Sequence, residues 1–332
     1  MNLKEEIRRN LCVNKISVSQ LDPNGLCNSK CWYCPVKYKG NPKEFINQMP
    51  IEDVEHIFKN IRNSSLLSHN FTDVLVNNFN EIFLYKDFSK LIKLFDKYKF
   101  TTLILTNGTT LNDEHIRIIL NNKDIIRELW IHIPVFNKEL WKQQTSLSEN
   151  LFDIMCKNLN NLHGQIKTTI HLSGINDKNI TKDFQKKYYN SMLLSQDDWL
   201  ENKKMLCFKY PKFKIIMDGL IDRAGMLVDH SAYKDEKVII LKENEEVFGC
   251  SFLYDNVSRV YNWLCVNAVG DVFLCCNDYD MKHIFGNLLR QTLDECWLSN
   301  KHVNTIINSF NSTCKKCVFR QIRKKYRGTR LL

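Results

Sequence analysis

Three cysteines near the N-terminus constrain this chain more than any other feature. Cys27, Cys31 and Cys34 form a Cys-x3-Cys-x2-Cys run, and no fourth cysteine lies nearby. Iron–sulfur clusters are normally held by four thiolates, so three of them would leave one iron of a cubane open to another ligand. With 13 cysteines in 332 residues, about 0.02 such runs are expected by chance. Buried thiols, or part of a zinc site, are the alternative interpretation.

The composition is that of an ordinary globular protein. Hydrophobic residues make up 44% and charged residues 25% of the chain, which are typical values. No apolar run reaches transmembrane length, and the charged N-terminus MNLKEEIRRN lacks a signal-peptide core. We therefore expect a cytoplasmic protein without membrane contact. Thiols stay reduced there, so the cysteines are better explained as metal ligands than as disulfides.

The net charge of +10 is compatible with nucleic acid, an anionic substrate or solubility alone. Because no fingerprint of a nucleic-acid-binding fold is present, nucleic acid is a disfavoured partner. Part of the charge lies near the C-terminus, where we expect a solvated basic tail containing Arg320, Arg323, Lys324, Lys325, Arg327 and Arg330.

The order of the apolar patterns predicts the fold class. Short β-like segments alternate with segments whose apolar residues recur at helical spacing. Such alternation predicts right-handed βαβ units around a parallel sheet, here an α/β fold with a partial (β/α)6 barrel similar to a TIM barrel. Active sites of parallel barrels lie at the C-terminal ends of the strands. The cysteine run follows the first of the six predicted strands, which are 15–21, 73–77, 101–106, 128–136, 165–172 and 213–217.

The N-terminal cysteine run also contains an aromatic residue, Tyr33, just before the last cysteine. In this form it resembles the signature of the radical S-adenosylmethionine (SAM) superfamily, Cys-x3-Cys-x-aromatic-Cys. The resemblance implies a 4Fe–4S cluster whose open iron chelates the amino and carboxylate groups of SAM. It also implies formation of a 5′-deoxyadenosyl radical, which is cofactor-borne radical chemistry, and a reductant such as flavodoxin or ferredoxin.

The same resemblance assigns cofactor-binding roles to residues that follow strands two and three. Asn80 and Glu81 lie where the family often has Gly-Gly-Glu, which implies that Glu81 binds the methionyl amino group. Neither glycine is present here, and a solvated loop is the alternative. Thr106 and Asn107 end strand three, where family members carry polar residues near the cofactor, although Asn is also common in turns for conformational reasons. Tyr33 completes this predicted cofactor-binding set.

A further element follows strand six. Arg223 in Asp-Arg-Ala-Gly resembles an arginine element of dehydrogenases in the family, which implies a catalytic role for a side chain with five donors in a rigid fork. An ordinary surface arginine is the alternative. His132 lies within strand four, where a structural histidine is favoured over a substrate-facing one.

The last third of the chain holds a second set of cysteines. Gly270 and Cys275 form Gly-x4-Cys, and Cys314 and Cys317 form Cys-x2-Cys. The arrangement resembles the SPASM domain and its shortened form, twitch. Because the cysteines needed for a second cluster are missing after Cys317, the resemblance implies one auxiliary 4Fe–4S cluster. Its predicted ligands are Cys250, Cys275, Cys314 and Cys317.

Two other cysteines in this region are weaker candidates. Cys265 competes with Cys250 for the first ligand position, but its apolar neighbours favour a buried core thiol. Cys276 follows a proposed ligand directly and would point away from it on a strand. A structural zinc site is the alternative for the whole region. We place the barrel domain at 1–228 and a small α+β twitch/SPASM domain at 229–332.

The resemblance implies an oxidoreductase that removes hydrogen from an unactivated C–H bond and passes an electron to the auxiliary cluster. The layout is similar to that of twitch dehydrogenases acting on aminocyclitol alcohols such as 2-deoxy-scyllo-inosamine, which favours a sugar-like or cyclitol-like small molecule. The alternative is a maturase that modifies a peptide or protein. A zinc-stabilised nucleic-acid-binding protein would explain the charge but not the N-terminal cysteine run.

Overall fold

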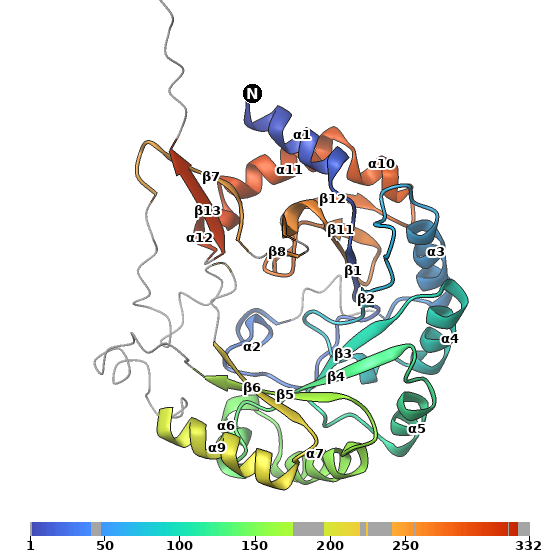
Figure 1. Ribbon diagram of the computed structural model, residues 1–332, viewed down its shortest axis with the longest axis vertical. Helices are drawn as coiled ribbons and strands as arrows, with labels where there is room; N and C mark the ends of the chain where they lie inside the picture. Colours follow the sequence, from blue (N-terminus) through green and yellow to red (C-terminus); the bar gives the residue numbers. More distant parts are fainter. Residues whose placement is uncertain are drawn as a thin grey trace, which may run out of the picture.

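A computed structural model of the chain describes residues 2–40, 48–174, 196–219, 224, 241–251, 253–254, 256–317 and 319–324. Its strands form an open ring with most of the helices on the outside (Figure 1). The barrel strands are β1 (Val18–Leu21), β2 (Val74–Leu75), β3 (Thr102–Thr106), β4 (Ile126–His132), β5 (Thr168–Gly174) and β6 (Lys214–Gly219). Their neighbours pair in parallel, and an isolated parallel bridge from Asp73 to Thr101 joins β2 to β3. The predicted partial (β/α)6 barrel is confirmed.

Amphipathic helices cover the outer face of this sheet because their apolar stripes bury against it. Phe58 of α3 and Phe95 of α4, for example, are fully buried and contact each other edge to face. The helices of the barrel are α3 (Ile51–Arg62), α4 (Phe88–Tyr98), α5 (Asp113–Asn121), α6 (Lys138–Thr145), α7 (Glu149–Leu162) and α9 (Gln196–Lys209), together with the short α2 (Pro35–Lys39) and η2 (Ile82–Leu84). Within the described residues, no helix is long and apolar enough to cross a membrane.

The C-terminal region continues the barrel sheet instead of forming a separate one. Strand β10 (Trp263–Val266) pairs in parallel with β1, and β11 (Asp271–Phe273) and β12 (Ile284–Asn287) follow in antiparallel order. One sheet therefore runs β12-β11-β10-β1-β2. The predicted domain boundary at 228/229 lies outside the described residues, but the two parts share this sheet.

Helices and a second small sheet complete the C-terminal part. The strands β7 (Glu245–Cys250) and β13 (Arg320–Lys324) are antiparallel partners. Arg323 on β13 pairs with Glu246 and with Glu6 at 2.9 Å each, so this part of the basic segment is structured rather than a solvated tail. The remaining elements are α1 (Leu3–Val13), β8 (Leu253–Tyr254), β9 (Val257–Ser258), η3 (Arg259–Tyr261), α10 (Leu293–Trp297), α11 (Asn300–Phe310) and α12 (Thr313–Lys316).

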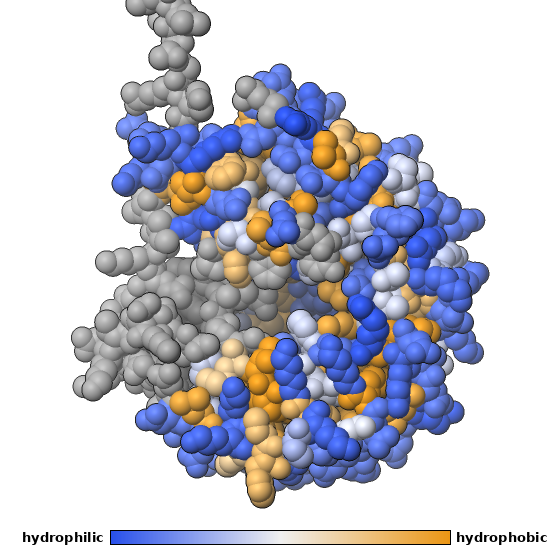
Figure 2. All heavy atoms as spheres, in the orientation of Figure 1, coloured by the Kyte–Doolittle hydropathy of each residue, from blue (hydrophilic) through white to orange (hydrophobic). Residues whose placement is uncertain are grey.

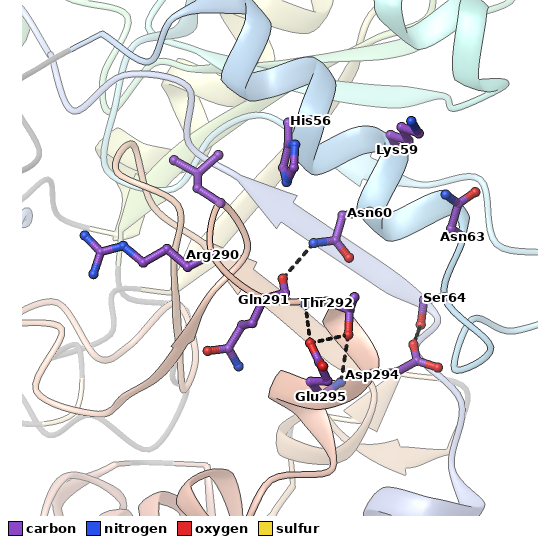
Figure 3. Close-up of a pocket in the computed structure, with 11 residues that line it drawn as sticks. His56, Lys59, Asn60, Asn63, Ser64, Arg290, Gln291, Thr292, Asp294 and Glu295 are labelled. Carbon is purple, nitrogen blue, oxygen red and sulfur yellow. Dashed lines mark hydrogen bonds between the residues drawn. The ribbon is translucent and has the colours of Figure 1, made fainter.

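A polar contact on the outer side joins α3 to the loop between β12 and α10. The side chain of Asn60 donates to the carbonyls of Leu288 and Gln291 at 3.0 and 2.9 Å, and accepts from the Leu293 N–H at 2.8 Å. Figure 3 shows Asn60 pointing at this loop across a groove of about 590 Å³, with Asn63 just after the end of the same helix. One amide therefore satisfies three backbone groups of the C-terminal part.

Replacing Asn60 should weaken this junction. We expect Asn60→Ala to lower the free energy of unfolding by about 2 kcal/mol, because partly buried backbone groups lose their partners. Asn63 is exposed on the same wall of the groove, so Asn63→Ala should change the free energy of unfolding by less than about 0.5 kcal/mol. Denaturant unfolding followed by circular dichroism measures both, and equal effects would contradict the assignment.

Candidate cofactor and cluster sites

The N-terminal cysteine loop leaves β1 and is held by the end of α6. The Lys30 N–H donates to the carbonyl of Thr145 at 2.9 Å, and the Trp32 N–H donates to that of Gln144 at 3.0 Å. Thr145 and Gln144 are buried, so the cysteine loop is attached to a well-packed part of the protein. The short helix α2, which begins directly after Cys34, lies inside the ring in Figure 1. The loop is thus placed where parallel barrels carry their active sites.

The three cysteines of this loop fit a cationic cluster. Burial raises the pKa of the Cys27 and Cys31 thiols, and the Glu81 carboxylate raises that of Cys27 further. The Ser29 hydroxyl lies 2.9 Å from the Cys31 sulfur. Thiolates in such a place need compensating positive charge, which the irons of a cluster supply. The residues present therefore fit the group that the sequence predicted.

Tyr33 turns toward the barrel interior and meets His132. Its hydroxyl lies 2.9 Å from Nδ1 of His132, and the two rings are 5.1 Å apart in an edge-on arrangement. Burial raises the pKa of Tyr33 well above its usual range. His132 ends β4, and sequence reasoning favoured a structural role for it. Its contact with the cysteine loop is a tertiary feature that no local pattern signals.

Glu81, Thr106 and Asn107 lie together, as their shared assignment required. Glu81 is only 1% exposed, and its carboxylate accepts from the Thr106 hydroxyl at 2.8 Å, the Asn107 N–H at 2.9 Å and the Phe83 N–H at 3.4 Å. Burial raises its pKa. Both carboxylate oxygens are therefore engaged by the chain itself, and the contacts hold the loop after β3.

Asn80 and Asn107 also have internal partners. The Asn80 side chain donates to the Val76 carbonyl at 3.2 Å and accepts from the Asn78 N–H at 3.1 Å, so it braces its own loop. Asn107 donates to Asn28 of the cysteine loop at 2.8 Å. Asn28 was missed by sequence reasoning, where its position between two predicted ligands was the sole signal.

The four predicted auxiliary ligands line one enclosed cavity of about 30 Å³. They come from the end of β7, the turn after β11 and the segment around α12. Burial raises the pKa of Cys275, and it raises that of Cys314 to about 12, with nearby thiols adding to both effects. This set of Cys250, Cys275, Cys314 and Cys317 also fits a cationic cluster.

The lining of this cavity also bears on two neighbouring cysteines, Cys276 and Cys265. Cys276 lines it, so the expectation that Cys276 points away was wrong. Strand β11 ends at Phe273, and the alternation of a strand does not extend into the turn that follows. Cys265 is fully buried on β10 among apolar side chains and is not part of the cavity lining. Arg223 lies outside the described residues, although its neighbour Ala224 lines the cavity.

Comparison with known proteins agrees with this geometry. Residues 23–186 match the family described as Radical SAM superfamily, and residues 258–318 match SPASM, described as an iron-sulfur cluster-binding domain. The chain belongs to the radical SAM superfamily. The predicted 4Fe–4S cluster with SAM and the auxiliary iron–sulfur cluster are thereby confirmed as its cofactors. No curated protein sequence matches the chain.

Several solved structures share its fold. Streptococcus suis SuiB bound to precursor peptide SuiA has a TM-score of 0.62 at 16% identity and covers 94% of this chain and 72% of SuiB. Native anSMEcpe with bound AdoMet gives 0.58 at 15%, covering 91% and 86%. BtrN in complex with AdoMet and 2-DOIA gives 0.50 at 17%, covering 90% and 88%. At these identities the similarity concerns the fold alone.

The buried Glu81 network makes a testable contribution to the stability of this radical SAM protein. We expect Glu81→Gln to lower the free energy of unfolding by about 2 kcal/mol, because an amide donor would face groups that themselves donate. Glu201→Gln, at an exposed position of α9, should change it by less than about 0.5 kcal/mol. Urea unfolding followed by fluorescence distinguishes the two variants, and a silent Glu81→Gln would contradict the network.

Proposed function

We propose that the chain is a radical SAM oxidoreductase acting on a sugar-like or cyclitol-like small molecule. In this proposal Cys27, Cys31 and Cys34 hold the cluster that binds SAM. When bound, SAM and its cluster supply a 5′-deoxyadenosyl radical able to take hydrogen from an unactivated C–H bond, and an auxiliary cluster can accept the electron that the substrate releases. A flavodoxin or ferredoxin in the cytoplasm would provide the reducing electron.

The observation that carries the proposal is the cavity lined by Cys250, Cys275, Cys314 and Cys317. Four thiols can complete the coordination of one cluster, and the sequence contains no cysteine after Cys317. A fully ligated cluster has no open iron for substrate, which suits it to electron transfer. Because β10 pairs with β1, the auxiliary region directly adjoins the barrel that holds the first cluster.

The other predicted residues have supporting roles in this proposal. Glu81, Thr106 and Asn107 form the wall of the SAM site through their shared hydrogen bonds, and Asn80 braces the adjoining loop. Tyr33 is positioned by His132. Arg223 is proposed as a catalytic residue that binds a substrate carboxylate or hydroxyl through its planar set of donors.

Metal content tests the class of the enzyme. Anaerobically reconstituted protein should contain about eight irons per chain, and the variant with Ala at Cys27, Cys31 and Cys34 should retain about four, as two cubanes require. The electron paramagnetic resonance spectrum of the wild type should change on addition of SAM. Cys250→Ala should lose auxiliary iron, whereas Cys265→Ala should not. Zinc without iron would overturn the proposal.

Product analysis separates the small-molecule enzyme from the alternative, a peptide maturase. SuiB, which has the same fold, was solved with a precursor peptide, so the fold accommodates either substrate class. With SAM and dithionite, the proposal expects 5′-deoxyadenosine and a ketone in equal amounts from an aminocyclitol or sugar alcohol. Mass spectrometry detects both products. Turnover of a short peptide encoded beside the gene, without turnover of any polyol, would favour the maturase.

A further inference from the structure

The inner surface of the ring is here called the lumen. The side chains of β1 and β10 that face it can be identified because side chains alternate between the two faces of a strand. Leu21 and Leu264 belong to the main core beneath the helices. Val18 and Cys265 belong to a second cluster on the opposite face. Because side chains of a strand alternate between faces, Gln20 and Asp22 share the lumen side with Val18. Figure 2 shows the molecular surface hollowed near the centre of the ring.

Asp22 stands at the C-terminal end of β1, where the lumen opens. Its N–H donates to the Val266 carbonyl at 2.9 Å, which continues the β1–β10 pairing by one residue. Its side chain accepts from the backbone of Asn78, in the loop after β2. Asp22 therefore lies between the barrel loop that carries Asn80 and Glu81, which its side chain contacts, and the strand that leads to the auxiliary cysteines, which its backbone contacts.

One oxygen of this carboxyl group has no donor. Asp22 is 5% exposed, and its Oδ1 has no hydrogen-bond partner among the described residues. Burial raises the pKa of Asp22 well above its usual range, and no cationic side chain in the described part of the chain opposes that effect. A buried acceptor without a donor is destabilising. Groups that a fold retains at such a cost commonly mark functional sites.

The neighbouring polar groups do not supply the missing donor. The Asn77 amide donates to the Leu105 carbonyl at 2.5 Å, and the Gln20 amide donates to the Asn77 carbonyl at 2.5 Å. The Asn267 side chain contacts Met281 and accepts from Val269 and Asp271. The amides of Asn77, Gln20 and Asn267 are thus engaged elsewhere, whereas the side-chain amide nitrogen of Asn78, whose backbone donates to Asp22, also has no hydrogen-bond partner among the described residues.

A comparison with Glu81 shows why Asp22 is the carboxyl group with an acceptor oxygen to spare. Sequence reasoning assigned the methionyl amino group to Glu81, but its two oxygens already accept from Thr106, Asn107 and Phe83. A carboxylate offers about four acceptor sites, so three internal donors leave Glu81 with about one. Asp22, beside the same loop, has an oxygen to offer.

We propose that Asp22 binds a primary ammonium group at the mouth of the lumen through Oδ1. A cation is favoured over a neutral hydroxyl because it would also keep the buried carboxylate ionised. Two sources share this chemistry, the α-ammonium of SAM and an amino group of the substrate. The inference rests on the proposed function, since both ligands belong to that reaction.

The test compares Asp22→Asn with a charge-matched control in holoenzyme that contains both clusters. Asp73→Asn removes a carboxylate from the other end of β2, where Asp73 accepts from Thr101 at 2.9 Å and pairs with Arg127. Isothermal titration measures the affinity for SAM and, separately, for 2-deoxystreptamine as an amine probe with myo-inositol as its uncharged counterpart. Thermal unfolding without ligands is recorded for each variant.

We expect Asp22→Asn to weaken either SAM or 2-deoxystreptamine by about 10- to 100-fold, the range for a hydrogen bond to a charged group, and to leave myo-inositol unaffected. The ligand that is weakened identifies the source of the ammonium. The melting temperature of Asp22→Asn should equal or exceed that of the wild type, because a buried carboxyl group with one unpartnered oxygen is removed. Asp73→Asn should leave both affinities unchanged.

Other outcomes overturn the assignment. Unchanged affinities for both amines would show that Asp22 binds no ammonium, and a marked drop in melting temperature would show that Oδ1 of Asp22 has a partner within the chain. Wild-type protein that binds no SAM would instead defeat the proposed function itself. The failure of one proposal is therefore distinguishable from the failure of the other.

Discussion

The parallel pairing of β1 with strands on both sides is the interaction on which the rest of the structure depends. All four residues of β1 are buried, and the strand pairs with β2 of the barrel and with β10 of the C-terminal part. A strand paired on one side only would expose a row of unsatisfied backbone groups. The C-terminal part removes that edge, and it thereby fixes the strand from which the cysteine loop departs.

Buried acidic groups lie at the end of this strand and in the loops beyond it. The carboxyl groups of Asp22 and Glu81 and the thiol of Cys27 all have a pKa raised by burial. Such groups are unfavourable in a protein interior unless positive charge compensates them. An iron–sulfur cluster and the ammonium and sulfonium groups of SAM carry that charge. The site is thus electrostatically prepared for its cofactors, and their binding should be coupled to the stability of the fold.

Some features could be predicted from the sequence because they are local. The cysteine run and the spacing of Gly270, Cys275, Cys314 and Cys317 indicated the cofactors, which the family comparison confirms. Strands of the barrel were located by their apolar patterns, although the fourth begins at Ile126 and ends at His132, whereas 128–136 was expected. The expected strand 73–77 forms only two paired residues, since local apolar pattern does not determine how far a partner strand extends.

The sequence by itself determined the residue types that chemistry needs and the order of the elements that carry them. Ligand spacing and hydrophobic periodicity are properties of residues close together in the chain, so both can be recognised from the sequence alone. The tertiary structure decided which groups meet: Tyr33 with His132 across 99 positions, Cys276 with the auxiliary cavity, and Glu81 with donors that occupy its carboxylate. These outcomes depend on where separate strands end and turn, and no local pattern encodes that.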